Sequence, residues 1–398
     1  MPNPFAHLYV HIPFCVAKCA YCAFYSEPAE ERRAERFLAA LEREIEAVAG
    51  RLAPQTIYIG GGTPTSLTAE QLERLLTHLR ACIPNLESRV TSRDFEWTVE
   101  TNPATLTSEK ARLLRLLGVN RVSVGAQALD DALLERLGRV HTVAMIHETV
   151  ETLRTAGFEN LNLDFIFAIP GQTVAQWGQT LRRAIAMRPQ HLSTYELTYE
   201  DDTPLLRRLE EEGAARTDEE TTLAMYELLL AVTAEGGFAQ YEVSNFALPG
   251  RECRHNLNYW RGGEYVGIGP SASGLVDGWR YKNVSNSDAY IQRIEHGQAP
   301  VECAERLTPR ARAGELAAFA LRMNEGIAAA AFERQTGFEL DQLWARELAD
   351  LTAQGLIEWD GERLRLTARG RLIADRVAES FIIVDKTEVG SHHPAYGH

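Results

Sequence analysis

Short apolar segments alternate with longer helical segments between residues 8 and 197, and this succession constrains the fold more than any other feature of the chain. Six segments have the length and composition of strands: Leu8–Ile12, Thr56–Ile59, Glu96–Glu100, Arg121–Val124, Asn162–Phe167 and Leu192–Leu197. The segments between them space apolar residues three and four apart, as amphipathic helices do: Arg33–Val48, Ala69–Arg80, Glu109–Leu117 and Val143–Ala156. Helical crossovers bring successive strands into one parallel sheet. The sequence therefore predicts an α/β fold built on a mostly parallel sheet.

The pattern changes near residue 290, and a chain of 398 residues has room for a second domain. We expect residues 1–290 to form the main domain, residues 291–385 a small C-terminal domain and residues 386–398 a mobile tail. In the C-terminal part, helical segments precede an alternation of apolar and polar residues around Asp360 and Gly361, which is typical of a hairpin. Helices followed by a hairpin predict a winged-helix-like module.

The formal net charge of −14 argues against a large nucleic-acid-binding surface, because a phosphate backbone requires a concentrated basic face. One arginine-rich run could contact phosphates, but in this acidic chain we interpret it as a solvated or protein-docking face: Arg363, Arg365, Arg369, Arg371 and Arg376. No apolar stretch approaches the roughly 18 residues that cross a bilayer, and the N-terminus shows no signal-peptide pattern. We expect a cytoplasmic protein with no nucleic-acid partner and no integral membrane segment.

Three of the six cysteines, Cys15, Cys19 and Cys22, form a C-x3-C-x2-C loop. Three thiolates on one loop can hold three irons of a [4Fe-4S] cluster and leave the fourth iron open to an exchangeable ligand. A zinc site is the alternative, but it needs a fourth ligand; residues 23–26 offer none, and His11 is a weaker candidate. The spacing therefore predicts an iron–sulfur cluster. The other cysteines stand alone, and we expect ordinary reduced thiols: Cys82, Cys253 and Cys303.

Polar residues follow several of the predicted strands, and functional groups gather at the carboxyl ends of parallel strands in barrel folds. A glycine run, residues 60–62, follows the second strand and allows close approach of the backbone to a ligand, although glycines also serve tight turns. On the next units, four polar side chains can bind a ligand, with helix capping or salt bridges as the alternative: Glu100, Gln127, Arg139 and Asp164. Their succession predicts a ligand site.

The cysteine loop resembles that of the radical S-adenosylmethionine (SAM) superfamily, and the resemblance covers roughly residues 5–380. It implies a partial (β/α)6 barrel of TIM type, a [4Fe-4S] cluster whose open iron takes the amino acid moiety of SAM, and an electron donor for reductive cleavage of the cofactor. The GGGTPT segment, residues 60–65, is similar to a glycine-rich segment of the coproporphyrinogen-oxidase-like branch. The resemblance to this branch places SAM contacts at Tyr9, Tyr21, Gly61, Gly62, Thr63, Glu100, Gln127, Arg139 and Asp164.

Two features indicate a position within the branch. Oxygen-independent coproporphyrinogen dehydrogenases carry a further cysteine two residues after the third cluster ligand, and here that residue is Phe24. Residues 255–260 read H-N-L-N-Y-W, similar to a motif of heme chaperones of the HemW type. Its imidazole can ligate iron and its aromatic rings can pack on a macrocycle, whereas a buried aromatic cluster with a hydrogen-bonded histidine is the alternative. The residues expected to contact heme are His255, Asn256, Tyr259 and Trp260.

One residue departs from the chaperone pattern. Ser273 stands where many relatives of that type have a histidine, so ligation of heme by His255 is a hypothesis. The resemblance implies a chaperone that binds the cluster, SAM and heme and transfers heme to an acceptor hemoprotein. The alternative is an oxygen-independent coproporphyrinogen III oxidase of porphyrin biosynthesis, and radical methyltransferases or heme-degrading relatives share the loop. No catalytic residue is assigned.

Overall fold

A nine-stranded sheet forms the main part of the computed structural model, which describes residues 4–92, 94–201, 203–213, 215–385, 388–390 and 395. Six neighbouring strands are parallel: β1 (Phe5–Ile12), β4 (Leu52–Gly61), β5 (Glu96–Thr101), β6 (Arg121–Gln127), β7 (Leu161–Phe167) and β8 (His191–Glu196). β11 (Val266–Ile268) adds a parallel strand beside β1, while β10 (Asn245–Ala247) and β9 (Ala239–Glu242) add antiparallel strands beyond β8. The predicted α/β fold and its mostly parallel sheet are confirmed.

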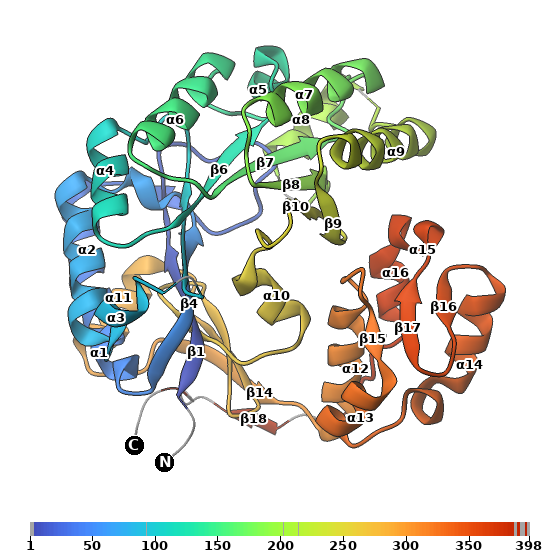
Figure 1. Ribbon diagram of the computed structural model, residues 1–398. Coiled ribbons are helices and arrows are strands. Elements are labelled where there is room, and N and C mark those ends of the chain that lie inside the picture. Colours follow the sequence, from blue (N-terminus) through green and yellow to red (C-terminus); the bar gives the residue numbers. More distant parts are fainter. Residues whose placement is uncertain are drawn as a thin grey trace.

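Helices between the parallel strands cover the outer face of the curved sheet, which stays open on one side (Figure 1). They are α1 (Glu31–Ala49), α2 (Ala69–Cys82), α4 (Ser108–Leu116), α6 (Val143–Thr155) and α7 (Val174–Ala186). Four of these helices begin after a threonine whose hydroxyl accepts a backbone N–H of the first turn, and these residues are Thr68, Thr107, Thr142 and Thr173. Short polar N-caps in the sequence therefore fix where the helices start.

The strands bury apolar side chains at alternate positions, as Leu8, Val10 and Ile12 do on β1. Polar side chains occupy other positions of these strands and bond to one another from strand to strand. Asn162 Oδ1, for example, lies 2.7 Å from His191 Nδ1. The half-barrel therefore has an apolar layer against its helices and a polar network along its strands.

The short helix α10 (Arg254–Trp260) lies across the open side of the half-barrel (Figure 1). Its N-cap, Cys253, supplies no side-chain cap; instead the carboxylate of Glu96 on β5 accepts the N–H groups of Arg254 and His255, each at 3.1 Å. At the other end of α10, the Trp260 ring makes an edge contact with Phe319. One side chain of the sheet thus positions the segment that joins the barrel to the C-terminal module.

A second sheet packs beside β11 and α1 and contains β12 (Ser273–Val276), β13 (Trp279–Asn283), β14 (Val301–Arg306) and β18 (Glu388–Gly390). The buried Glu44 of α1 connects to this region, because its carboxylate accepts the Gly269 N–H at 2.8 Å and an Asn283 amide hydrogen at 2.9 Å. The helix α11 (Ser287–Glu295) packs on α1. The main hydrophobic core therefore continues through Ala304.

The expected division of the chain at residue 290 stays a prediction, and this packing favours a division after residue 306. Most of the expected mobile tail lies outside the described residues, namely 386–387, 391–394 and 396–398. Within it, β18 pairs with β14 and Ala395 is buried.

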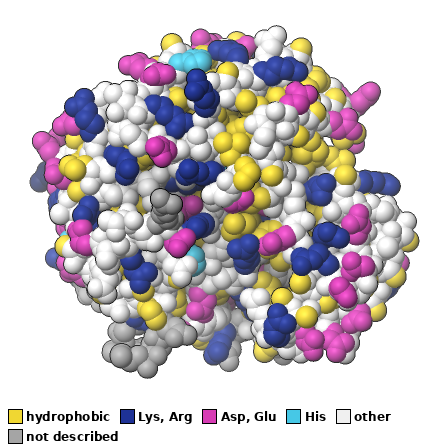
Figure 2. Space-filling view, in the orientation of Figure 1, with side chains coloured by type: hydrophobic (Ala, Val, Ile, Leu, Met, Phe, Trp, Pro, Cys, Tyr) yellow, Lys and Arg dark blue, Asp and Glu magenta, His cyan; other side chains and the backbone are white. Residues whose placement is uncertain are grey.

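The C-terminal module has its own hydrophobic core, which includes Phe332, Trp344 and Phe381. Its elements are α12 (Pro309–Ala320), β15 (Ile327–Ala328), α13 (Ala329–Thr336), α14 (Leu340–Ala353), β16 (Ile357–Trp359), β17 (Arg363–Leu366), α15 (Ala368–Leu372) and α16 (Ala374–Glu379). β15 lies between α12 and α13, and β16 and β17 follow α14; this element order and the sheet order β15-β17-β16 are typical of a winged-helix module. Acidic and basic side chains are interspersed over the visible face of the module (Figure 2). Among the described residues, no helix is long and apolar enough to cross a membrane.

Replacing Cys15, Cys19 and Cys22 together by alanine should leave a protein that unfolds in one cooperative thermal transition. The reason is that none of these half-buried thiols belongs to either hydrophobic core. Circular dichroism of the metal-free variant measures this. Trp97→Ala, which empties a fully buried position, is the contrasting control and should lower the free energy of unfolding by about 3–5 kcal/mol. Loss of a cooperative transition in the triple variant would contradict the expectation.

Candidate functional site

The cysteine loop follows β1 and is anchored by backbone hydrogen bonds on both sides. The Ala20 N–H donates to the Leu137 carbonyl at 2.9 Å, and the Ala20 carbonyl accepts the Leu205 N–H at 2.8 Å. All three cysteines of the loop are half-buried and form no disulfide. Because the loop backbone is fixed on the barrel, the three thiols are held on one short segment beside the strand ends.

The groups around the loop fit a metal cluster bound through thiolates. Arg139 Nη1 donates to Cys19 Sγ at 3.1 Å, so a cation lies against the sulfurs. Burial raises the pKa of the Cys15 and Cys22 thiols, and bound metal is what would displace their protons. His11, the alternative ligand, has its Nδ1 3.0 Å from the Tyr9 hydroxyl and its ring against Gly61. The donor set that the loop itself offers is three sulfurs.

The glycine run at the end of β4 lies where close backbone approach leaves no room for side chains. A Cβ on Gly62 would meet the Phe14 carbonyl oxygen at 2.6 Å, and one on Gly60 would meet the Glu100 carboxyl at 2.8 Å. Gly61 has a φ of +103°, a conformation that favours glycine. Its N–H donates to Glu100 Oε2 at 3.1 Å. The run therefore connects the cysteine loop to the acid at the end of β5.

Glu100 and Asp164 are the two acids of the predicted ligand site. The Tyr58 hydroxyl donates to Glu100 Oε1 at 2.7 Å. Burial raises the pKa of Glu100 to about 7, and the nearby charge of Asp164 acts in the same direction. Burial also raises the pKa of Asp164, although Ser123 Oγ donates to its carboxylate at 2.9 Å. Both acids are therefore held among neutral hydrogen-bond donors.

Gln127 and Arg139 meet over Gly125, because a Cβ on Gly125 would lie 3.0 Å from Gln127 Nε2 and 3.2 Å from Arg139 Nη2. Gln127 stands at a register irregularity between β6 and β7 and has a φ of +64°, which strains a residue with a side chain. Arg139 also donates to the Gly125 carbonyl at 2.8 Å. The guanidinium thus spans the strand end and the cysteine loop, and it pairs with no carboxylate in the part of the chain that the structure describes.

The remaining predicted SAM contacts lie beside these groups. Thr63 Oγ1 is 3.6 Å from Cys15 Sγ, and the ring centroids of Tyr9 and Tyr58 are 6.2 Å apart. Burial raises the pKa of Tyr21, while the positive charge of Arg139 opposes this shift. Tyr9 and Asp164 therefore stand within their strands, while the other predicted SAM residues lie at strand ends or on and beside the cysteine loop.

The H-N-x-x-Y-W helix adjoins the acid site, because the His255 ring packs on the ring of Tyr58 with 5.3 Å between centroids. His255 is 1% exposed, with Nδ1 2.6 Å from Thr56 Oγ1 and Nε2 2.7 Å from the Tyr259 hydroxyl. Thr56 precedes Tyr58 by two positions on β4, and the Tyr58 hydroxyl donates to Glu100, so Tyr58 lies between the imidazole and the acid. Both ring nitrogens are engaged, and the geometry matches the alternative interpretation, a buried aromatic cluster with a hydrogen-bonded histidine. Asn256 is half-buried on the same helix.

Sequence reasoning missed side chains that hold the predicted ones in place. Tyr58 and Ser123 donate to the two acids, and an Asn162 amide hydrogen donates to Asp164 at 2.7 Å. Strand alternation could have identified two of them, because residues two positions apart on a strand face the same side of the sheet. Asn162 lies two positions before Asp164, and Tyr58 lies two positions before Gly60.

This half-barrel, with three cysteines on the loop after its first strand, defines the class as the radical SAM superfamily. The Radical SAM superfamily profile matches residues 9–184, and that of the HemN C-terminal domain matches residues 307–373. The fold is that of the coproporphyrinogen III oxidase HemN from Escherichia coli, with a TM-score of 0.84 at 24% identity over 96% of this chain and 91% of that one.

Relatives in several bacteria are similar over nearly their whole length. "Heme chaperone HemW" of Lactococcus lactis is 35% identical over 95% of this chain and 97% of its own. The protein of the same name in Bacillus subtilis is 35% identical over 94% and 98%, and the one in Escherichia coli K12 32% identical over 94% and 97%. The chain belongs to the HemW family. Membership in the radical SAM superfamily implies a [4Fe-4S] cluster and SAM.

Glu100→Gln should change how stability depends on pH. Because the folded protein binds the Glu100 proton more tightly than the unfolded chain, the stability that this group contributes is present below pH 4.5 and is lost as the pH rises through about 7. The unfolding free energy of the parent relative to Glu100→Gln should fall by about 3 kcal/mol over this window. Urea titrations at several pH values measure the difference. Glu109→Gln, at an exposed position, is the control. If the unfolding free energies of Glu100→Gln and Glu109→Gln depended on pH in the same way, the raised pKa of Glu100 would be contradicted.

Proposed function

We propose that this protein is a heme chaperone that binds a [4Fe-4S] cluster, SAM and heme and delivers heme to an acceptor hemoprotein in the cytoplasm. The observation that carries the proposal is the 35% identity to a protein named heme chaperone HemW over 95% of the chain. Phe24, in place of a further cysteine, argues against the coproporphyrinogen dehydrogenase alternative. The proposed partners are heme, the acceptor and an electron donor for the cluster.

In this proposal, Cys15, Cys19 and Cys22 hold the cluster, and the polar residues at the strand ends hold SAM. When bound, the reduced cluster supplies an electron for cleavage of SAM. Arg139 balances negative charge at the thiolates through its contact with Cys19 Sγ. The carboxyl of Glu100 exchanges a proton near neutral pH and offers hydrogen bonds to hydroxyl groups of the ligand.

Exposed apolar side chains on and beside the cysteine loop give heme a place to dock. Val16 lies within the loop and is 58% exposed, and Phe24 lies two residues after Cys22 and is 71% exposed. Val140 is 51% exposed and follows Arg139, whose guanidinium contacts Cys19. Apolar groups exposed in this way pack against the face of a macrocycle at a gain of about 25 cal/mol per Å² of buried apolar surface. We therefore assign the first heme contact to this surface, called the loop face: Val16, Phe24 and Val140.

The second heme contact of the proposal is the H-N-x-x-Y-W helix with His255, Asn256, Tyr259 and Trp260. For His255 to ligate iron, it has to leave the Thr56 hydroxyl, and α10 has to separate from the Glu96 carboxylate. Heme ligation by His255 is therefore a second step that requires an opened α10, whereas docking on the loop face needs no rearrangement.

The test is a heme titration of anaerobically reconstituted protein, followed by absorption spectroscopy and then by transfer to an apo-hemoprotein. We expect saturable binding of about one heme per chain, transfer to the acceptor, and no protoporphyrinogen from coproporphyrinogen III. Phe24→Ser should weaken heme binding several-fold, because it removes apolar contact from the loop face. Val384→Ser, at an exposed valine of the C-terminal module, is the matched control and should have no effect.

His255→Ala separates the two heme contacts. A change in the heme spectrum with little loss of affinity supports loop-face docking followed by ligation through His255. Formation of protoporphyrinogen IX with consumption of SAM would establish the oxidase instead, and absence of any saturable heme binding would refute the chaperone.

A further inference from the structure

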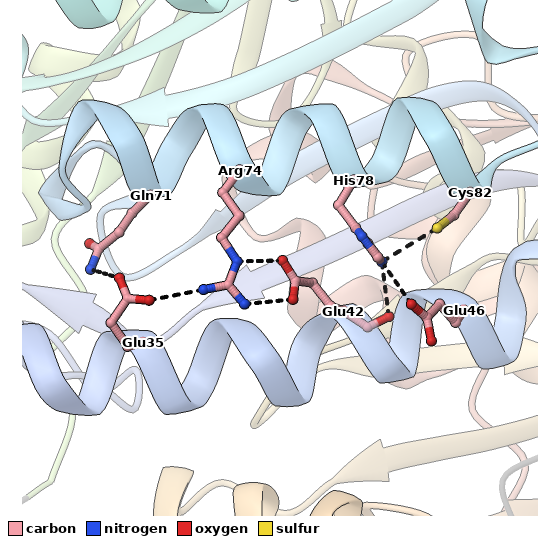
Figure 3. A network of polar contacts seen from close by, with 7 residues as sticks. All are labelled: Glu35, Glu42, Glu46, Gln71, Arg74, His78 and Cys82. Atoms are coloured by element: carbon pink, nitrogen blue, oxygen red, sulfur yellow. Dashed lines mark hydrogen bonds and ion pairs between the residues drawn. The ribbon is translucent and has the colours of Figure 1, made fainter.

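A cluster of metal-ligating side chains lies between the outer helices α1 and α2, apart from the cysteine loop (Figure 3). His78 and Cys82 stand four residues apart on α2, so both side chains project from one face of that helix. Glu46 comes from the facing helix, α1. The ligand atoms of the three residues lie within 4.8 Å of one another.

Two of the three separations between the ligand atoms match those of a tetrahedral zinc centre. His78 Nε2 is 3.4 Å from Cys82 Sγ and 3.5 Å from Glu46 Oε1. With zinc bonds of about 2.3 Å to sulfur and about 2.0–2.1 Å to nitrogen and oxygen, tetrahedral angles place such atom pairs roughly 3.3–3.6 Å apart. The imidazole of His78 therefore stands at the spacing that one ion requires from both other ligands, and a small movement of the exposed Glu46 side chain completes the set.

The neighbouring contacts between the two helices show why this cluster differs from an ordinary ion pair. Arg74 donates to both carboxylate oxygens of Glu42, each at 2.6 Å, and Gln71 donates to Glu35 at 2.8 Å (Figure 3). Each of those contacts joins a donor on α2 to a carboxylate on α1. At the next position along the helices, α2 presents an imidazole and a thiol instead. Among the described residues, the Glu46 carboxylate forms no ion pair with Lys or Arg.

We propose that Glu46, His78 and Cys82 form a zinc site that clamps α1 to α2. Carboxylate, imidazole and thiolate are all ligands of Zn²⁺, and three protein ligands leave the fourth tetrahedral position to water. Binding displaces one proton from the Cys82 thiol and moves the proton of His78 to Nδ1, which releases the contact of 3.2 Å between His78 Nε2 and the Glu42 carbonyl. The Glu46 side chain is 59% exposed, so the ion enters directly from solvent.

The experiment titrates Co²⁺ and Zn²⁺ into the full chain carrying Cys15→Ala, Cys19→Ala and Cys22→Ala, so that the cysteine loop takes no metal. We expect one equivalent of Co²⁺ with the intense visible bands of tetrahedral cobalt and a thiolate-to-cobalt charge-transfer band, and displacement of the cobalt by Zn²⁺. Cys82→Ser should abolish the charge-transfer band. His78→Ala should weaken zinc binding at least about 100-fold, because it removes a direct ligand.

Matched controls remove the same residue types elsewhere. Cys303→Ser and His296→Ala change an exposed thiol and an exposed imidazole and should leave the spectrum and the affinity unchanged. Should the triple background fail to fold, the same titration is made on cluster-loaded protein, with Cys82→Ser compared with Cys303→Ser. Cobalt binding that survives both His78→Ala and Cys82→Ser, or no binding in the parent, would overturn the proposal. Neither result depends on heme or SAM.

Discussion

The carboxylate of Glu96 is the group on which the arrangement of the molecule depends. A half-barrel leaves its interior open on one side, where α10 lies, and Glu96 anchors that helix by accepting its first two N–H groups. These donors have no partner within a helix, so a buried carboxylate stabilises them strongly. With its first turn fixed, α10 directs His255 inward to Thr56 and Trp260 outward to the core of the C-terminal module.

The polar network inside the barrel follows from this closure. Two acids, Glu100 and Asp164, are withdrawn from water among neutral donors, and burial raises the pKa of both. The guanidinium of Arg139 lies at the edge of the network, against a sulfur of the cysteine loop. A ligand with hydroxyl and amino groups finds preoriented partners there, and a thiolate-bound cluster finds a compensating charge. The chemistry is concentrated at the strand ends because the backbone of the glycine run brings the loop and the acids together.

The outer surface has a different organisation. The loop face exposes apolar side chains next to the cysteines, where a macrocycle can dock without entering the barrel. In the helical layer, α1 and α2 are joined by a series of polar contacts that ends in an imidazole and a thiol. Cys82 stands apart from the other cysteines in the sequence; His78 lies one turn before it on α2, and the packing of α1 on α2 adds Glu46. The sequence predicts a reduced thiol at Cys82, and this is its form without metal. In the proposed zinc site the same side chain is a ligand.

The sequence determined the βα succession, the cysteine triplet and the residues at the strand ends, because these depend on local spacing and on the fixed geometry of parallel strands. It could not determine the role of His255. The H-N-x-x-Y-W motif fits heme ligation and core packing equally; the contact with Tyr259 lies within α10, but the hydrogen bond to Thr56 arises only when strand and helix meet. Likewise, the packing of α11 and β14 against the first core, and the approach of His78 and Cys82 to Glu46, join residues far apart in the chain. Local pattern carries no information on such contacts, so tertiary structure alone decided them.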